Sequence, residues 1–451
     1  MRRLVDLATR RSGVIFGAMV AACSAFVLWL GFGLTFFSDE WAFIEHRSLL
    51  DPSTWWAPHN EHWSTLPILV YGVLLQVVGL RTYVPYLAVV YALHVVACAG
   101  VFVLVRRRSG PIAGLGAALI GLLLGAGFEN LFWGFQLGFV GSTAAGIWAF
   151  AIIDRSPTTE RRAGLAALIT ASLASSGIGL TFLAAAGAAL LLRPAWRGSW
   201  RWLALPIVAY AAWFILIGHT GVGIDRQPLT FDTLVAIPGF VAGGYANAVG
   251  AILGIGPDLG FYAAGLAAVV VVSLAFRRRL GSPVLGVACV IGLAVQYALI
   301  AAARAGVTVD QVDYSRYTYV GALLTLIALA DVVGPTRLPA APLRRILAIG
   351  ALLAVLELGL FWNVRLLLEG RDLFAARAMT TRALVQVALD PSYADRVAPD
   401  RSLVLIPAPV VLQAIVDRYG SPLTDVLVPG AVPPIIPQAI NDALRRAAAV
   451  R

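Results

Sequence analysis

The sequence predicts an all-α polytopic membrane protein, with about eleven transmembrane helices, interfacial helices in the outer loops and a small C-terminal extracytoplasmic α/β domain. Of the 451 residues, 59% are hydrophobic, and the mean hydropathy is +0.83. The apolar residues form repeated runs near the roughly 20 residues that a helix needs to cross a bilayer, not the narrow stripes of a soluble protein.

The charge pattern indicates the same class. The net charge is +10, and the basic residues are all arginines, most of them in short loops between apolar runs. This distribution orients a membrane protein and differs from the continuous basic surface of a nucleic-acid-binding protein. We therefore expect a lipid bilayer around the chain and no nucleic acid partner.

The first apolar run, 14–37, is too long for the core of a cleaved signal peptide, so we expect it to be retained as the first span. We expect a multi-pass protein of the cytoplasmic (inner) membrane. By the positive-inside rule, the arginines before the first span place the N-terminus in the cytoplasm and the loop 38–67 outside. The next runs are 66–80 and 83–105. If both crossed, Arg106, Arg107 and Arg108 would lie outside, so we predict an interfacial or re-entrant helix at 66–80 and a span at 83–105.

The rest of the module 1–362 alternates consistently. The run 163–192 breaks at Ser175-Ser176-Gly177 into two short spans, and 219–258 is predicted to be a long outer loop whose Gly-rich apolar stretch lies on or dips into the membrane. The other predicted spans are 111–127, 137–153, 203–218, 259–276, 283–303, 319–334 and 346–362.

The tail, 363–451, differs in composition from the module. It has two apolar runs that end in turn residues (RSLVLIP and PVVLQAIVDRYGSP), a proline-rich link and an amphipathic helix at 439–450. This order predicts the extracytoplasmic α/β domain.

The loop 38–67 concentrates ionisable and aromatic groups: five acids, three of the five histidines and four of the twelve tryptophans. Asp39 and Glu40 stand where the first span leaves the bilayer. An ionisable residue at that depth is costly and indicates a functional site, although a solvated helix end is the simpler alternative. Trp55 and Trp56 fit an interfacial belt, and they also suit stacking on a sugar ring.

Several roles are possible for three polar residues in the segment PHNEHW of this loop: His59, Glu61 and His62. They suit hydrogen bonds to a donor or an acceptor, or an interfacial polar cluster. A divalent cation is a further alternative, but the spacing matches no strong metal template, and we assign no metal ligands.

Further polar groups gather at the predicted outer ends of other spans. Acids with nearby arginines suit group transfer from an anionic leaving group to a hydroxyl: the carboxylate takes the proton, and the guanidinium stabilises the departing phosphate. Each arginine also fits pairing with a loop acid or snorkelling along a span. These candidates are Glu129 and Gln136 (FENLFWGFQLGF), His219 and Arg226, Arg304, and Arg316 and Tyr317 (SRYTYVG).

The acidic pair outside the first span, the long first loop and the number of spans resemble the superfamily-C glycosyltransferases, above all the protein O-mannosyltransferases and the bacterial aminoarabinose and arabinose transferases. The likeness covers the layout of nearly the whole chain, but its motifs are short. It implies a polyprenyl-phosphate-linked sugar donor and inversion at the anomeric carbon. From FSDEWAF it implies Asp39 as general base with Glu40 as its partner.

The resemblance also implies that Arg316 and Tyr317 contact the lipid phosphate. Arg304 and Arg226 are further candidates because of their positions at predicted outer span ends. The acceptor would be the hydroxyl of an envelope glycan, lipid or protein. The sequence lacks the lysine that the family often has near the middle break, and the second acid is either Glu129 or replaced by Gln136. A transporter or flippase for a lipid-linked sugar, or a non-catalytic assembly protein, remains the alternative.

Overall fold

A computed structural model describes residues 10–221, 230–276, 283–304, 315–335, 341–390 and 406–423. Within these ranges the chain is helical, and its one strand-like pairing is an isolated bridge between His59 and His62. The α-helices are α2 (Ser12–Leu30), α3 (Asp39–His46), α4 (Thr65–Val77), α5 (Val84–Ser109), α6 (Pro111–Leu122), α7 (Glu129–Phe132), α8 (Leu137–Ile153), α9 (Thr159–Leu173), α10 (Gly179–Leu192), α11 (Trp200–Leu216), α12 (Phe231–Leu253), α13 (Pro257–Phe276), α14 (Val284–Arg304), α15 (Ser315–Val333), α16 (Pro342–Ala388) and α17 (Pro409–Tyr419). Short 3-10 turns are η1 (Pro52–Trp55), η2 (Gly125–Gly127), η3 (Gly134–Gln136), η4 (Pro194–Ser199) and η5 (Gly218–Gly221).

Eight helices in the described ranges are long and apolar enough to cross a membrane. They include α2, α5, α12, α14, α15 and α16, with α8 and α11 each extended by the preceding 3-10 turn. The polytopic helical class is therefore confirmed, but the count of about eleven spans is not supported. The helices α4, α6, α10 and the first part of α13 are apolar but shorter.

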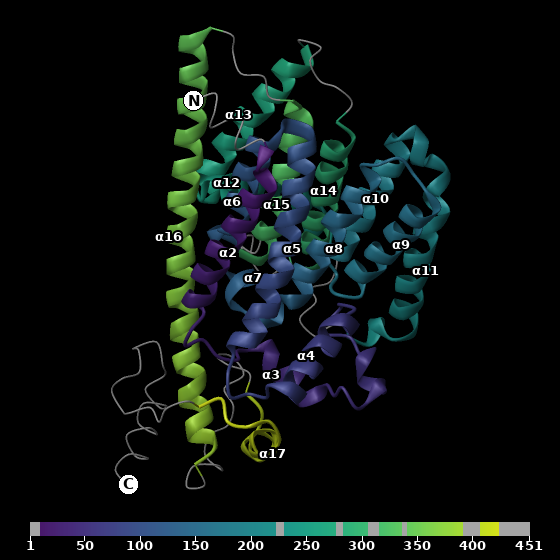
Figure 1. Cartoon of the computed structure of the whole chain (residues 1–451). Coiled ribbons are helices and arrows are strands. Elements are labelled where there is room, and N and C mark those ends of the chain that lie inside the picture. Colours follow the sequence, from purple (N-terminus) through teal and green to yellow (C-terminus); the bar gives the residue numbers. More distant parts are fainter. Residues whose placement is uncertain are drawn as a thin grey trace.

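The bundle is assembled around α5, which packs against α6, α8 and α15 (Figure 1). Small residues allow these close approaches, as is usual where the hydrophobic effect does not drive helices together. A Cβ on Gly100 of α5, for example, would lie 2.5 Å from Ile147 of α8. Larger side chains at such positions would force the helices apart.

Two predictions from hydropathy fail here. The stretch 219–258 is not one outer loop, because its residues 231–253 form α12, which packs against α13, α14, α15 and α16. The tail is not α/β in its described parts: 363–388 continue α16, 409–419 form a helix, and no strand occurs among them. The predicted helix at 439–450 lies outside the described residues.

The helix α16 has 47 residues. At 1.5 Å per residue it is roughly 70 Å long, more than twice the ~30 Å hydrocarbon core of a bilayer. Figure 1 shows it along the full height of the molecule, with its last turns beside α3 and α17. We call this end of the bundle, which carries α3, α4 and α17, the site end.

The opposite end, here the basic end, is held by ion pairs between helices. Asp154, after α8, accepts from Arg108 of α5, from Arg107 Nη1 at 3.3 Å and from Arg193 Nη2 at 3.2 Å. Arg108 Nε also lies 3.0 Å from Asp331 Oδ1 of α15. These pairs tie the ends of α5, α8, α10 and α15 together.

Candidate functional site

The first residue of α3 is Asp39, and its side chain is half-buried. Ser38, just before it, has a φ of +53°, in the left-handed region that a residue with a Cβ rarely adopts. Backbone strain of this kind often accompanies functional sites because the surrounding structure must hold it in place. The chain thus enters α3 through a sharp turn that fixes where Asp39 lies.

Glu40, the next residue, is completely buried. Its carboxyl group accepts hydrogen bonds from the Phe37 N–H at 2.8 Å, the Tyr71 hydroxyl at 2.7 Å and the Tyr83 hydroxyl at 2.9 Å. Burial raises the pKa of Glu40 to about 8, although these hydrogen bonds oppose the shift. These contacts give Glu40 a structural role, because they fasten α3 to α4 and to the start of α5. Its role as partner of the base stays a prediction.

The segment PHNEHW forms a tight hairpin. His59 and His62 exchange backbone hydrogen bonds of 3.2 and 3.0 Å, and Asn60 in the turn has a φ of +51°. Residues directly opposite each other in an antiparallel pair direct their side chains to the same face, so the two imidazoles are neighbours. The sequence singled out these residues, but it gave no indication of the hairpin.

His59 faces Asp39. Its Nε2 lies 4.0 Å from Asp39 Oδ1, and its ring packs edge-on against Phe43 and Phe135. Burial lowers the pKa of His59 to about 3, so the imidazole is neutral at physiological pH. Nε2 has no hydrogen-bond partner among the described residues, which leaves it able to bond to a ligand beside Asp39.

His62 fills the break between α9 and α10. A Cβ on Gly177 would lie 2.6 Å from His62 Nδ1, so the glycine in the predicted break is needed for the imidazole to fit. Glu61 Oε1 lies 4.0 Å from His62 Nε2. In the part of the chain that the structure describes, no three His, Cys, Asp or Glu side chains converge as a metal site.

A second cluster joins α7 to the start of α15. The Glu129 side chain accepts the Arg316 N–H at 3.2 Å, and the Glu129 N–H donates to Ser315 Oγ at 3.2 Å. The Arg316 guanidinium lies 5.4 Å from the centre of the Tyr317 ring. It interacts electrostatically with the carboxylates of Glu129 and Asp39. The two motifs that carried the resemblance therefore meet at the site end.

The structure adds Arg377, which the sequence did not indicate. Its guanidinium lies 5.0 Å from the ring centre of Phe37 and 4.9 Å from that of Phe374. It interacts electrostatically with Glu129 and Arg316. Arg377 lies in the tail that was predicted to be a separate domain, and the uninterrupted helical run through 363–388 was the one signal that connects it to the spans.

The remaining predicted site residues are more scattered. Gln136, in η3, is buried, and its Oε1 accepts no hydrogen bond within the described ranges. Trp55 is half-buried and donates to the Ser48 carbonyl at 3.1 Å, whereas Trp56 is 46% exposed, with its ring centre 6.5 Å from that of Trp63. His219 is exposed on η5. Arg304 ends α14, but its side chain, like the whole of Arg226, lies outside the described residues.

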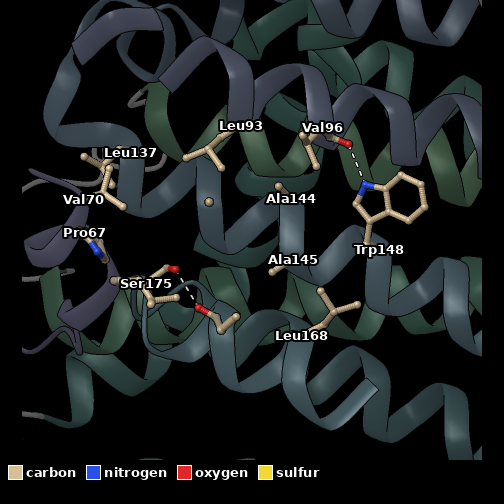
Figure 2. Close-up of a pocket in the computed structure, with 13 residues that line it drawn as sticks. Pro67, Val70, Leu93, Val96, Leu137, Ala144, Ala145, Trp148, Leu168 and Ser175 are labelled. Carbon is tan, nitrogen blue, oxygen red and sulfur yellow. Dashed lines mark hydrogen bonds between the residues drawn. The ribbon is translucent and has the colours of Figure 1, made fainter. Parts of the chain in front are cut away.

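An apolar cavity of about 480 Å³ lies between α4, α5, α8 and α9 (Figure 2). The indole of Trp148 closes one side and donates to the Val96 carbonyl at 2.9 Å. Ser175 is the one hydroxyl on its wall, and it is bonded to the Ala171 carbonyl at 2.7 Å. Two residues that line the cavity are close in sequence to the site end: Leu137 directly follows η3, and Pro67 lies in the first turn of α4, shortly after the histidine hairpin.

A second groove, of about 400 Å³, lies between α3 with the loop that follows it and α17. Its walls combine apolar side chains with charges of both signs, the latter from Glu45, Arg47, Asp51 and Arg418. α17 is fixed here because the Tyr419 carbonyl accepts the Leu80 N–H at 2.9 Å. The groove shares α3 with Asp39.

No family model, curated protein or solved structure matches the chain. The functional argument therefore depends on the geometry of the chain itself.

Proposed function

We propose that the protein is a membrane glycosyltransferase that moves a sugar from a polyprenyl-phosphate donor to the hydroxyl of an envelope glycan, lipid or protein. One observation supports this best: Asp39, neutral His59 and Arg316 come together at one end of an apolar helix bundle. A carboxylate beside a guanidinium provides a base and a contact for an anionic leaving group in one place.

In the proposed reaction, Asp39 accepts the proton of the acceptor hydroxyl. The oxygen forms a bond to the anomeric carbon as the bond from that carbon to the phosphate oxygen breaks, and the electron pair leaves with the phosphate. Attack opposite the leaving group inverts the configuration. His59, being neutral, has an Nε2 that can bond to the acceptor hydroxyl without adding a charge beside Asp39.

Arg316 would contact the departing phosphate, which its planar fork suits. The cavity of Figure 2 would hold part of the polyprenyl chain, because its walls are almost entirely apolar and it lies within the bundle. The mixed charges of the groove beside α17 suit a hydroxylated acceptor.

The positive-inside rule assigns the arginines of the basic end to the cytoplasm. With that orientation the N-terminus is cytoplasmic and the site end faces outward in the cytoplasmic (inner) membrane. The reaction would therefore occur at the extracytoplasmic face, where envelope acceptors are found.

The test is release of polyprenyl phosphate from a panel of polyprenyl-phosphate sugars by purified protein in nanodiscs. We expect release by the wild type, at least 10²-fold slower release by Asp39→Asn because the general base is lost, and unchanged release by the control Glu160→Gln, an exposed carboxylate in the first turn of α9. If the wild type and Asp39→Asn both bind carrier lipid but neither turns over any donor, the transferase proposal is wrong. A transporter or an assembly protein would then explain the chain better.

A further inference from the structure

The helix α16 carries Arg377 to the site on a firmly packed scaffold. The amide of Asn363 donates to the carbonyls of Gly359 and Ala251, at 2.9 and 3.1 Å, and its Oδ1 accepts the Ala126 N–H at 3.1 Å. One turn before Arg377, Phe374 is buried against aromatic rings that include Trp133. Because packed helices place side chains more accurately than loops do, the position of Arg377 is well defined.

Within the described residues, Arg377 differs from Arg365 and Arg371 of α16 in having no carboxylate at ion-pair distance, although it interacts electrostatically with Glu129. Arg365 pairs with Glu369 at 2.8 Å and Arg371 with Asp372 at 2.9 Å, both on the exposed side of the helix. Arg377 instead lies half-buried over the rings of Phe37 and Phe374. Aromatic faces hold a guanidinium in place without neutralising it, so its N–H groups remain available to an anion.

The surrounding charges also favour an anion. The Glu129 carboxylate attracts the guanidiniums of both Arg377 and Arg316, and these two guanidiniums repel each other. Glu129 also accepts the backbone N–H of Arg316, so the two guanidiniums share one carboxylate that is already hydrogen-bonded. Phe37, which Arg377 covers, is two residues before Asp39 and is held by a 3.2 Å hydrogen bond from Trp133 Nε1 to its carbonyl. An anion between the two guanidiniums would relieve their repulsion beside the base.

We propose that Arg377 is a second phosphate contact, which acts mainly on the charge that develops as the donor bond breaks. This inference rests on the proposed function. The donor is a phosphodiester with one negative charge. When the bond to the anomeric carbon breaks, the electron pair stays on the phosphate oxygen, and polyprenyl phosphate departs as a monoester with a second negative charge. One guanidinium balances the donor, and the second balances the charge that appears during the reaction.

Such a contact affects kcat more than the KM of the donor, because the interaction is stronger in the transition state than in the ground state. For Arg377→Gln we expect kcat to fall roughly 10²-fold with a donor KM within about threefold of wild type. Arg377→Lys keeps the positive charge but loses the planar, forked guanidinium, so its kcat should lie between those of the wild type and Arg377→Gln. Arg365→Gln, on the same helix, is the matched control and should behave as wild type.

Binding of the product gives a readout that does not depend on turnover. Polyprenyl phosphate should bind Arg377→Gln about tenfold more weakly than wild type, and neutral polyprenol should bind both proteins equally. Unchanged kcat and unchanged affinity for polyprenyl phosphate in Arg377→Gln would overturn the inference. Equal weakening for polyprenol would do the same, because it would indicate loss of packing. If the wild type turns over no donor, the proposed function fails, and the comparison of the two lipids alone decides whether Arg377 binds phosphate.

Discussion

Replacing Glu40 tests how the reactive end of α3 is held. Glu40→Ala leaves the hydroxyls of Tyr71 and Tyr83 and the N–H of Phe37 without their buried acceptor. Each unsatisfied group costs about 1–3 kcal/mol, and Tyr83 keeps its bond from the Gly134 N–H, so we expect a loss of about 3–5 kcal/mol. Glu40→Gln keeps the shape and one acceptor oxygen and should cost far less at neutral pH.

The same carboxyl group should make stability depend on pH. Its pKa is about 8 in the folded protein against an ordinary value of 4.5, so the folded state keeps a proton that the unfolded state loses in between. The contribution of Glu40 to stability is therefore complete below about pH 4.5 and is lost as the pH rises to about 8, a loss of about 4–5 kcal/mol in total. Glu40→Gln removes this titration, and above pH 8 it should be more stable than wild type.

The assay is thermal unfolding in nanodiscs, followed by tryptophan fluorescence between pH 5 and 9, with Glu45→Gln as the exposed control. Transfer activity is measured on the same samples. The reasoning is refuted if Glu40→Ala melts with the wild type, or if Glu40→Gln loses as much stability as Glu40→Ala. Loss of transfer in a stable Glu40→Gln variant would show that Glu40 has a direct role beside Asp39.

Two further predictions concern the ends and the interior of the bundle. Asp154→Ala leaves Arg107, Arg108 and Arg193 without their shared carboxylate. Since these arginines are partly exposed, we expect the free energy of unfolding to fall by about 2 kcal/mol. A melting temperature equal to that of the wild type would contradict this. Ala144→Trp fills the cavity of Figure 2. It should raise the KM for long-chain donors about tenfold and leave the KM for donors with a short prenyl chain unchanged. Equal KM changes for both chain lengths would show that the polyprenyl chain lies elsewhere.

Local sequence patterns predicted a large part of this molecule. The apolar runs indicated most of the helices, and the break at Ser175-Ser176-Gly177 does separate α9 from α10. The resemblance implied Asp39 as base and Arg316 as phosphate contact from two short motifs, and in the structure the two side chains interact electrostatically at the site end. The proximity of these charges was therefore predictable, although their chemistry stays a proposal.

Other features depend on contacts between distant residues. In the sequence Glu40 is one half of an acidic pair. Its hydrogen bonds to Tyr71 and Tyr83, which lie 31 and 43 residues further along the chain, could not be predicted from the local pattern. Hydropathy reports where apolar residues end but not where a helix ends, so α16 was cut at 362 and Arg377 was assigned to another domain. The Gly-rich stretch of α12 was placed in a loop because its packing partners come later in the chain.

The anomeric configuration of the transferred sugar tests the central claim most directly. The donor would carry a sugar of known configuration, and NMR of the purified product would report the new linkage. We expect inversion, because Asp39 acts as a base for one direct displacement and forms no bond to the sugar. Retention would contradict this account, since it requires a covalent glycosyl-enzyme intermediate. Absence of any sugar transfer under conditions where the protein binds the donor would contradict the proposed function as a whole.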